Sequence, residues 1–144
     1  MKVPLRIFVI TLLFAGSALW LSSCKKDPVP PTLTTAAVSA ITLTTATSGG
    51  NVTADGGAEV TSRGVCWNTL ENPTVSNNKT SDGTGTGPFT SSLTGLTPGT
   101  PYFVRAYATN EAGTTYGNQQ SFTTSPVMLA TVTKIGRASC RERV

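Results

Sequence analysis

Apolar and polar residues alternate in short runs between positions 32 and 124, and no helical period is present in this stretch. A period of two is typical of strands that bury one face, and turn sequences rich in Gly, Pro and Asp separate the runs. These turns lie at 55–57, 72–73, 81–88, 97–99 and 111–113. The pattern predicts an all-β fold, an antiparallel β-sandwich. Strands are expected at 32–38, 44–55, 60–67, 89–93, 102–110 and 115–123.

The clearest alternation lies within 102–110. One face carries Tyr102, Val104, Ala106 and Ala108. The other face carries Phe103, Arg105, Tyr107 and Thr109. We expect the first set to face the core, because its members are smaller and Arg105 must reach water.

The apolar run at 65–67 is continuous, so the period does not indicate which of its faces is buried. We expect Trp67 in the core or half-buried. Cys66 is expected to be a small packed side chain rather than a nucleophile.

The first 23 residues have the three parts of an export signal. Lys2 and Arg6 form a basic start, an apolar stretch covers 7–21, and the small residues Ser22 and Ser23 follow. Fifteen residues at ~1.5 Å each reach roughly 22 Å, short of the ~30 Å apolar core of a bilayer. The stretch therefore predicts a cleaved signal peptide, with an uncleaved signal anchor as the alternative.

The run Leu21-Ser22-Ser23-Cys24 resembles the lipobox of bacterial lipoproteins. The resemblance implies that a diacylglycerol is attached to the thiol of Cys24 and that the chain is cleaved before it. Several acyl chains at ~0.8 kcal/mol per buried methylene make such an anchor stable. A basic residue, Lys25, after the cysteine implies the outer membrane of a Gram-negative cell. Residues 24–31, with three prolines, would form the lipidated, semi-rigid tether.

The net charge of +4 belongs to the two ends of the chain. Residues 28–134 carry four basic and five acidic side chains, a net charge of −1. The middle of the chain therefore has no excess of positive charge that would attract a nucleic acid, and we predict no nucleic-acid partner.

The segment from Leu96 to Gly113 resembles a turn, a strand and a second turn of fibronectin type III domains. It contains the turn Thr97-Pro98-Gly99 followed by Tyr102. The resemblance covers about 31–124 and implies a fibronectin type III or immunoglobulin-like sandwich at 32–125. Tyr102 would form the tyrosine corner, its hydroxyl bonding back across the turn. The chain departs from the family at Ala46 and Ser48, where many of these domains have a tryptophan.

Positions 126–133 echo positions 28–34, at a spacing near 98 residues, which indicates that a second repeat begins at 126–134. Residues 135–144 resemble, residue for residue, one reading frame of a widely used sequencing adapter. We therefore exclude this stretch, with Cys140, from the fold and interpret it as a non-native tail. The alternative is a genuine basic tail for a nucleic acid or heparin.

The chain contains no histidine, which excludes catalysis by Ser-His-Asp or Cys-His groups and His-ligated zinc within it. The five acids of the domain lie in or beside turns, where solvated surface is expected. Residues 83–87 alternate Gly and Thr but lack the spacing of a phosphate loop, so a flexible turn is predicted. Asp55 and Glu59 could touch calcium, but their oxygen ligands are too few for a site. We predict no enzyme activity, no cofactor and no metal.

Two classes of function remain open. The sandwich is either a spacer or repeat module of a larger surface protein, or a binding module of the envelope for a glycan or a protein. In the second case the loop 71–86 would supply contacts, and Phe103 and Tyr107 would be the aromatic residues in a row. The module could also be an accessory domain of a secreted carbohydrate-active enzyme, truncated here. Fold alone does not decide among these functions.

Overall fold

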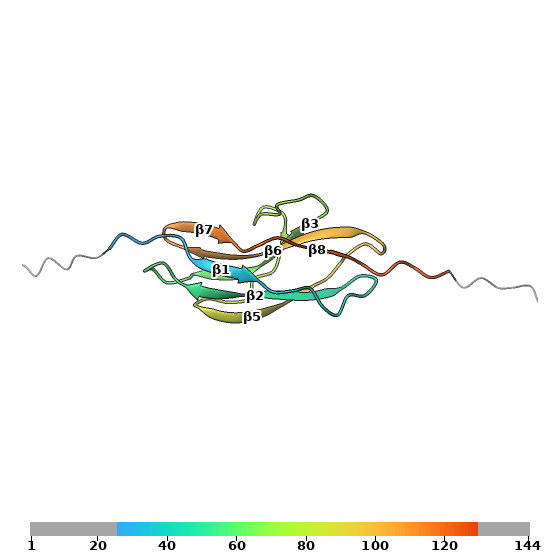
Figure 1. The fold of residues 1–144 in the computed structure, drawn as a ribbon, viewed down its shortest axis with the longest axis horizontal. Helices are drawn as coiled ribbons and strands as arrows, with labels where there is room; N and C mark the ends of the chain where they lie inside the picture. The colour runs from blue at the N-terminus through green and yellow to red at the C-terminus, as the bar shows by residue number, and fades with distance from the viewer. Residues whose placement is uncertain (1–25, 130–144) are drawn as a thin grey trace, which may run out of the picture.

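The computed structural model describes residues 26–129, which form eight β-strands and no helix (Figure 1). The strands are β1 (Thr32–Thr35), β2 (Ala46–Ala54), β3 (Ser62–Asn68), β4 (Asn78–Lys79), β5 (Gly87–Leu93), β6 (Pro101–Asn110), β7 (Gly113–Tyr116) and β8 (Gln120–Thr123). No helix within these residues could span a membrane. The predicted leader, Cys24 and the tail 135–144 lie outside the described residues.

Two antiparallel sheets face each other, as Figure 1 shows. One sheet has the order β1-β2-β5. The other has the order β4-β3-β6-β7, and β8 also pairs with β6. The predicted all-β sandwich is therefore confirmed.

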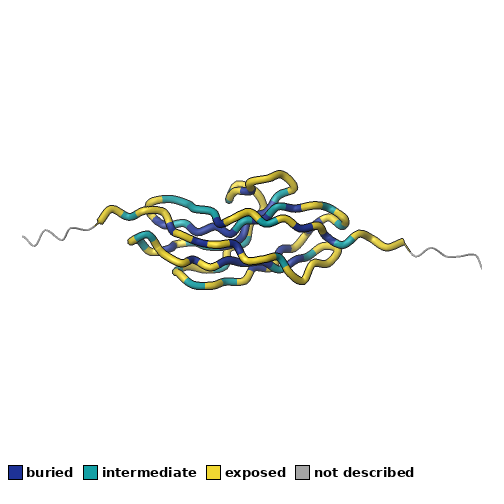
Figure 2. Tube along the Cα trace, viewed as in Figure 1, coloured by how far each residue is buried: buried dark blue, intermediate teal, exposed yellow. Residues whose placement is uncertain are grey.

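The core lies between the sheets, where the tube in Figure 2 is darkest. Tyr102, Val104, Ala106 and Ala108 are all buried, as the alternation in β6 predicts. Val65 and Trp67 of β3 belong to the same cluster as Val104 and Leu93, which establishes that this face of β3 is turned inward. Trp67 is buried, in agreement with the sequence.

The second face of β3 and β6 is also covered, which the alternation alone does not predict. Tyr107 was expected to face outward, yet only 3% of its surface is exposed, and its hydroxyl donates to the Thr80 carbonyl at 2.7 Å. The connection between β3 and β5 lies over this face. Asn72 N–H donates to Gln119 Oε1 at 2.5 Å, and Val75 N–H donates to Tyr116 Oη at 3.2 Å.

The strands differ from the prediction most in the length of the first strand, in the presence of β4 and in the division of the last strand. The first strand ends at Thr35 rather than 38. β4 has only two residues, both exposed, so it carries no apolar alternation. The predicted strand 115–123 is divided into β7 and β8 around Gly117. A Cβ at Gly117 would overlap the Thr35 hydroxyl and the Thr35 backbone nitrogen, so the connection between β7 and β8 comes into close contact with β1 there.

The chain enters the sandwich through a hydrogen-bonded clamp rather than a free tether. Val29 N–H donates to the Gly56 carbonyl at 2.9 Å, and the Asn110 side-chain amide donates to the carbonyls of Val29 (2.8 Å) and Asp55 (2.7 Å). The Asn110 Oδ1 accepts the N–H groups of Ala112 and Gly113, so both ends of this buried amide are used. Pro31 is fully buried. The predicted tether 24–31 is therefore shorter, because it becomes part of the domain at Val29.

The chain leaves at the opposite end, and its exit is fixed as well (Figure 1). Ser125 N–H donates to the Thr42 carbonyl at 2.9 Å, and the Ser125 carbonyl accepts the Gly99 N–H at 3.1 Å. The buried Thr124 hydroxyl donates to the Thr97 carbonyl at 2.6 Å. Entry and exit are thus held at the two poles of the long axis. We call the end at Val29, 55–60 and 110–113 the entry pole, and the end at 39–45, 94–100 and 125–127 the exit pole.

Candidate functional site

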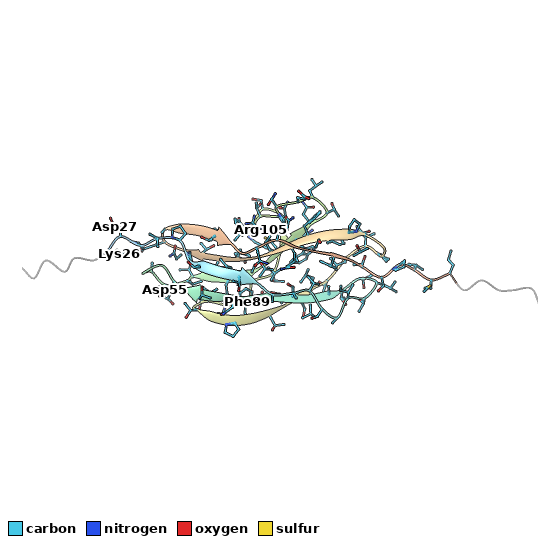
Figure 3. The ribbon with its side chains drawn as sticks, viewed as in Figure 1. Lys26, Asp27, Asp55, Phe89 and Arg105 are labelled. Carbon is cyan, nitrogen blue, oxygen red and sulfur yellow. The ribbon has the colours of Figure 1, made fainter. Side chains whose placement is uncertain are left out.

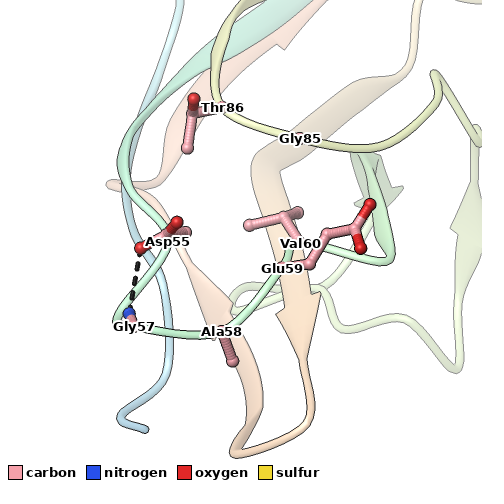
Figure 4. Close-up of a pocket in the computed structure, with 7 residues that line it drawn as sticks. All are labelled: Asp55, Gly57, Ala58, Glu59, Val60, Gly85 and Thr86. Carbon is pink, nitrogen blue, oxygen red and sulfur yellow. Dashed lines mark hydrogen bonds between the residues drawn. The ribbon is translucent and has the colours of Figure 1, made fainter. Parts of the chain in front are cut away.

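A shallow depression of about 500 Å³ lies at the entry pole (Figure 4). The turn between β2 and β3 forms one wall, and the segment before β5 forms the other. Its lining residues are Asp55, Gly57, Ala58, Glu59, Val60, Gly85 and Thr86. The fold thus brings together the two turns whose sequences resemble, in part, a calcium site and a phosphate loop.

The two carboxylates of the depression do not converge on one point. Asp55 Oδ1 accepts the Gly57 N–H at 2.9 Å, whereas the Glu59 carboxylate points toward the side of Gly85 (Figure 4). Within residues 26–129, no group of three His, Cys, Asp or Glu side chains could hold a metal ion. The structure therefore assembles no multidentate calcium cage here.

The Gly-Thr turn at 83–87 presents carbonyl groups rather than N–H groups toward its neighbour Arg63. The Arg63 guanidinium donates through Nη1 to the carbonyls of Gly85 (3.2 Å), Thr86 (2.9 Å) and Gly87 (3.3 Å). The Gly85 N–H donates to the Val60 carbonyl at 2.8 Å. A phosphate cradle needs free backbone N–H donors. This turn instead binds the cationic side chain of Arg63 through its carbonyl groups. The turn predicted to be flexible is held in place by Arg63.

A polar cluster that sequence reasoning missed joins the two sheets near this turn. The Asp82 carboxylate accepts hydrogen bonds from the hydroxyls of Thr80 (2.7 Å) and Ser91. Ser91 lies at an inward position of β5 and is 1% exposed. The only signal in the sequence was a serine where the alternation expects an apolar residue. Because these groups satisfy one another, the cluster stabilises the packing of the sheets.

The proposed aromatic row is not available as a ligand platform. Tyr107 is buried, and only Phe103 of the predicted pair is partly exposed. Arg105 instead places its guanidinium 4.8 Å from the ring centre of Tyr116, while its Nε donates to the Gly117 carbonyl at 3.1 Å. Arg105 is labelled in Figure 3.

Cys66 lies on the covered face of β3, under Pro73 and Arg105. Its sulfur is 3.4 Å from the carbonyl oxygen of each. Burial raises the pKa of the Cys66 thiol from 9.0 to about 11, so the thiol stays protonated near neutral pH. A protonated, buried thiol is a poor nucleophile, which agrees with its interpretation as a packed side chain.

The turn before β6 has the geometry of a tyrosine corner. Tyr102 Oη accepts the backbone N–H of Thr97 at 3.1 Å across the turn that contains Pro98 and Gly99. The Tyr102 ring stacks on Phe122 with their centres 5.8 Å apart. This corner is the one that the resemblance to fibronectin type III domains implied, and it lies in a sandwich with the strand orders β1-β2-β5 and β4-β3-β6-β7. The chain folds as a fibronectin type III-like β-sandwich.

Comparisons with known proteins agree with this fibronectin type III-like fold. No family model matches the chain, and no curated protein matches it by sequence. Among solved structures, the sensor domain of the anti-sigma factor RsgI4 from Pseudobacteroides cellulosolvens has a TM-score of 0.51 and 18% identity. That match covers 70% of this chain and 100% of the sensor domain.

A second similar structure is the sixth fibronectin type III domain of human fibronectin type III domain containing protein 3. It is 23% identical with a TM-score of 0.44, over 74% of this chain and 92% of that domain. A computationally redesigned β-sandwich is 25% identical with a TM-score of 0.47, over 69% and 97% of the two chains. At 18% identity, the likeness to the RsgI4 sensor domain shows a shared fold alone. Cys24 lies outside the described residues, so its lipidation stays a prediction.

Proposed function

We propose that this fibronectin type III-like domain is a non-catalytic spacer or repeat module of a larger surface protein, anchored in the outer membrane by lipid on Cys24. The observation that supports this proposal is that the chain enters at one pole and leaves at the other, with both ends fixed by hydrogen bonds. Val29 is bonded to Gly56 and Asn110, and Ser125 is bonded to Thr42 and Gly99. A module held this way keeps a fixed separation between its anchor and the next domain of the chain.

The anchor and the clamp are close together along the chain. Five Cα–Cα steps separate Cys24 from Val29, and they reach at most about 18 Å. The entry pole would therefore lie near the bilayer surface. The ten residues of β6 span roughly 33 Å along the long axis, so the exit pole would lie well above it.

The lipid anchor is tested by growing cells with labelled palmitate. The protein expressed with its leader should take up the label and partition into detergent, and Cys24→Ala should abolish both. Equal membrane retention by the Cys24→Ala variant would overturn the lipoprotein assignment.

The spacer role is tested by energy transfer from dyes on the lipidated protein to labelled lipids in vesicles. One dye is placed on Glu59→Cys at the entry pole and, in a separate protein, on Met128→Cys beyond the exit pole, both in a Cys140→Ser background. Both positions are exposed, and the native Cys66 is buried. We expect strong transfer from position 59 and weak transfer from position 128. Equal transfer from both sites would mean that the domain lies flat on the membrane, contradicting the spacer role.

A further inference from the structure

The exit pole differs from the entry pole in charge. The described segments 36–45, 94–100 and 123–129 contain no charged side chain. The entry pole carries Asp55, Glu59 and Glu111, and Figure 3 shows Asp55 at this end together with Lys26 and Asp27, whose opposite charges offset each other. Two entry poles would repel each other, whereas an exit pole can accept an entry pole without opposing like charges.

The exit pole also presents apolar side chains from a rigid turn. Thr42 and Thr45 bond to each other, with Thr42 N–H donating to the Thr45 carbonyl at 2.8 Å and Thr45 N–H donating to Thr42 Oγ1 at 2.9 Å. Ser125 N–H and Leu96 N–H donate to the carbonyls of Thr42 and Thr44, so the turn is also held by the rest of the exit pole. Ile41 and Leu43 project from the turn with 38% and 43% of their surface exposed.

The chain continues from this pole with apolar residues that the domain does not cover. Ser125 bonds to Thr42, between Ile41 and Leu43, and Val127, Met128 and Leu129 follow with 62%, 90% and 89% exposure. A contiguous run of exposed apolar side chains is typical of a surface that a partner buries. A following domain of the same chain would lie next to this run.

Position 127 is the counterpart of Val29 in the echo between the two segments. Val29 is the first residue that the clamp of this domain holds. If Val127 is held in the same way by the next copy, only Pro126 separates the last fixed residue of one domain from the first fixed residue of the next. The proline ring restricts φ, and Pro126 already lies against Gly99.

We propose that the entry pole of a second copy of this domain packs against the exit pole, on the surface formed by Ile41, Leu43 and 125–127. The inference rests on the proposed role as a repeat module and adds to it a stiff, head-to-tail junction with one free residue. Head-to-tail contacts of this kind extend into a row of domains rather than closing into a dimer.

The test uses the mature chain from Lys25 to Ser125, followed directly by a second copy of residues 28–125. One spin label is placed on Thr90→Cys of each copy, an exposed position in the middle of β5. We expect a single narrow distribution of distances between the labels. A control with Gly-Ser-Gly-Ser inserted after the first Ser125 should give a broad one.

Substitutions then locate the contact. Ile41→Ser with Leu43→Ser in the first copy should broaden the distribution to the width of the control. Leu70→Ser is the matched control, because Leu70 is 71% exposed but lies in the connection between β3 and β4. If the double variant fails to fold by circular dichroism, Leu43→Ser alone is measured.

A broad distribution in the parent protein would overturn the stiff junction. A narrow one that survives the exit-pole substitutions would overturn the role of Ile41 and Leu43. Either result leaves the palmitate and energy-transfer experiments unaffected, so failure of the junction is distinguishable from failure of the spacer role.

Discussion

The side-chain amide of Asn110 donates to the carbonyl of Val29 at 2.8 Å, joining residues 81 positions apart. Asn110→Ala would leave the Val29 and Asp55 carbonyls and two turn N–H groups without this partner. We expect a loss of about 2–3 kcal/mol in the free energy of unfolding. In hydrogen exchange, the Val29 N–H should lose its protection while the amides of β6 that pair with β3 keep theirs.

A matched pair of glycines provides the control for this clamp. Gly56 and Gly57 both have positive φ, at 75° and 88°, so alanine is strained at either position. A Cβ at Gly56 would overlap the Val29 carbonyl, whereas a Cβ at Gly57 meets nothing within 4 Å. Gly56→Ala should therefore release Val29, and Gly57→Ala should not. Equal protection of the Val29 N–H in the two variants would contradict the clamp.

Tyr102→Phe should lower the free energy of unfolding by about 1–3 kcal/mol, because the Thr97 N–H loses its acceptor. The ring that stacks on Phe122 is retained in this variant, so urea unfolding reports on the hydroxyl alone. Tyr116→Phe is a useful comparison, since its hydroxyl accepts the Val75 N–H in a loop instead. A loss near zero for Tyr102→Phe would mean that the corner does not stabilise the domain.

Stability should fall as the pH rises through the range 9 to 11, in part because of Cys66. Burial raises the pKa of its thiol from 9.0 to about 11, so the unfolded chain ionises first and the folded state holds the proton longer. The contribution of Cys66 is complete below pH 9 and is lost progressively above it. Urea unfolding at several pH values, with Cys24→Ser and Cys140→Ser as background, measures the slope.

Cys66→Ala is the control for this pH dependence, because it removes the titrating thiol and leaves the tyrosines and lysines unchanged. Its stability should decline less steeply than that of the parent between pH 9 and 11. Parallel curves for the two proteins would show that the thiol ionises equally easily in both states.

Resequencing the locus should replace residues 135–144 with a continuation that resembles residues 36–50. The adapter's reading frame supplies the last two bases of codon 134, and the remaining first base, A, fits both Lys and Thr. Since Thr35 holds the matching place in the first repeat, we expect Thr at position 134. Another Leu-x-Pro-Gly-Thr-x-Tyr turn should follow further on.

The library for this experiment must be prepared without that adapter. Recovery of Ile135-Gly-Arg-Ala-Ser-Cys140 from it would contradict the adapter interpretation and favour the basic tail.

The sequence predicted the features that depend on local alternation and turn chemistry, and missed those that depend on distant contacts. The inward face of β6 and the corner at Tyr102 come from patterns within about fifteen residues. The burial of Tyr107 depends on Thr80, and the docking of Val29 depends on Asn110. Neither partner is visible in the neighbouring sequence.

The depression at the entry pole illustrates the same limit. The turns that contain Asp55 and Gly85 were identified separately, but only the folded chain places them side by side. The N–H groups that donate to the carbonyls of the 83–87 turn belong to Arg63, more than twenty positions earlier. A turn sequence alone does not reveal which of its backbone groups are already occupied.

The opposite positions of entry and exit have a mechanical consequence. Tension between an anchored N-terminus and a distal load would run along the strands, with β1 pulled against β2 and β8 against β6. Ladder hydrogen bonds lie across that direction, so they are loaded in shear and must yield together rather than peel apart one by one. Thr35 adds two further cross-links, from its N–H to Asn118 at 3.0 Å and from the Ala106 N–H to its hydroxyl at 3.0 Å. A load along the long axis would therefore be shared among these hydrogen bonds.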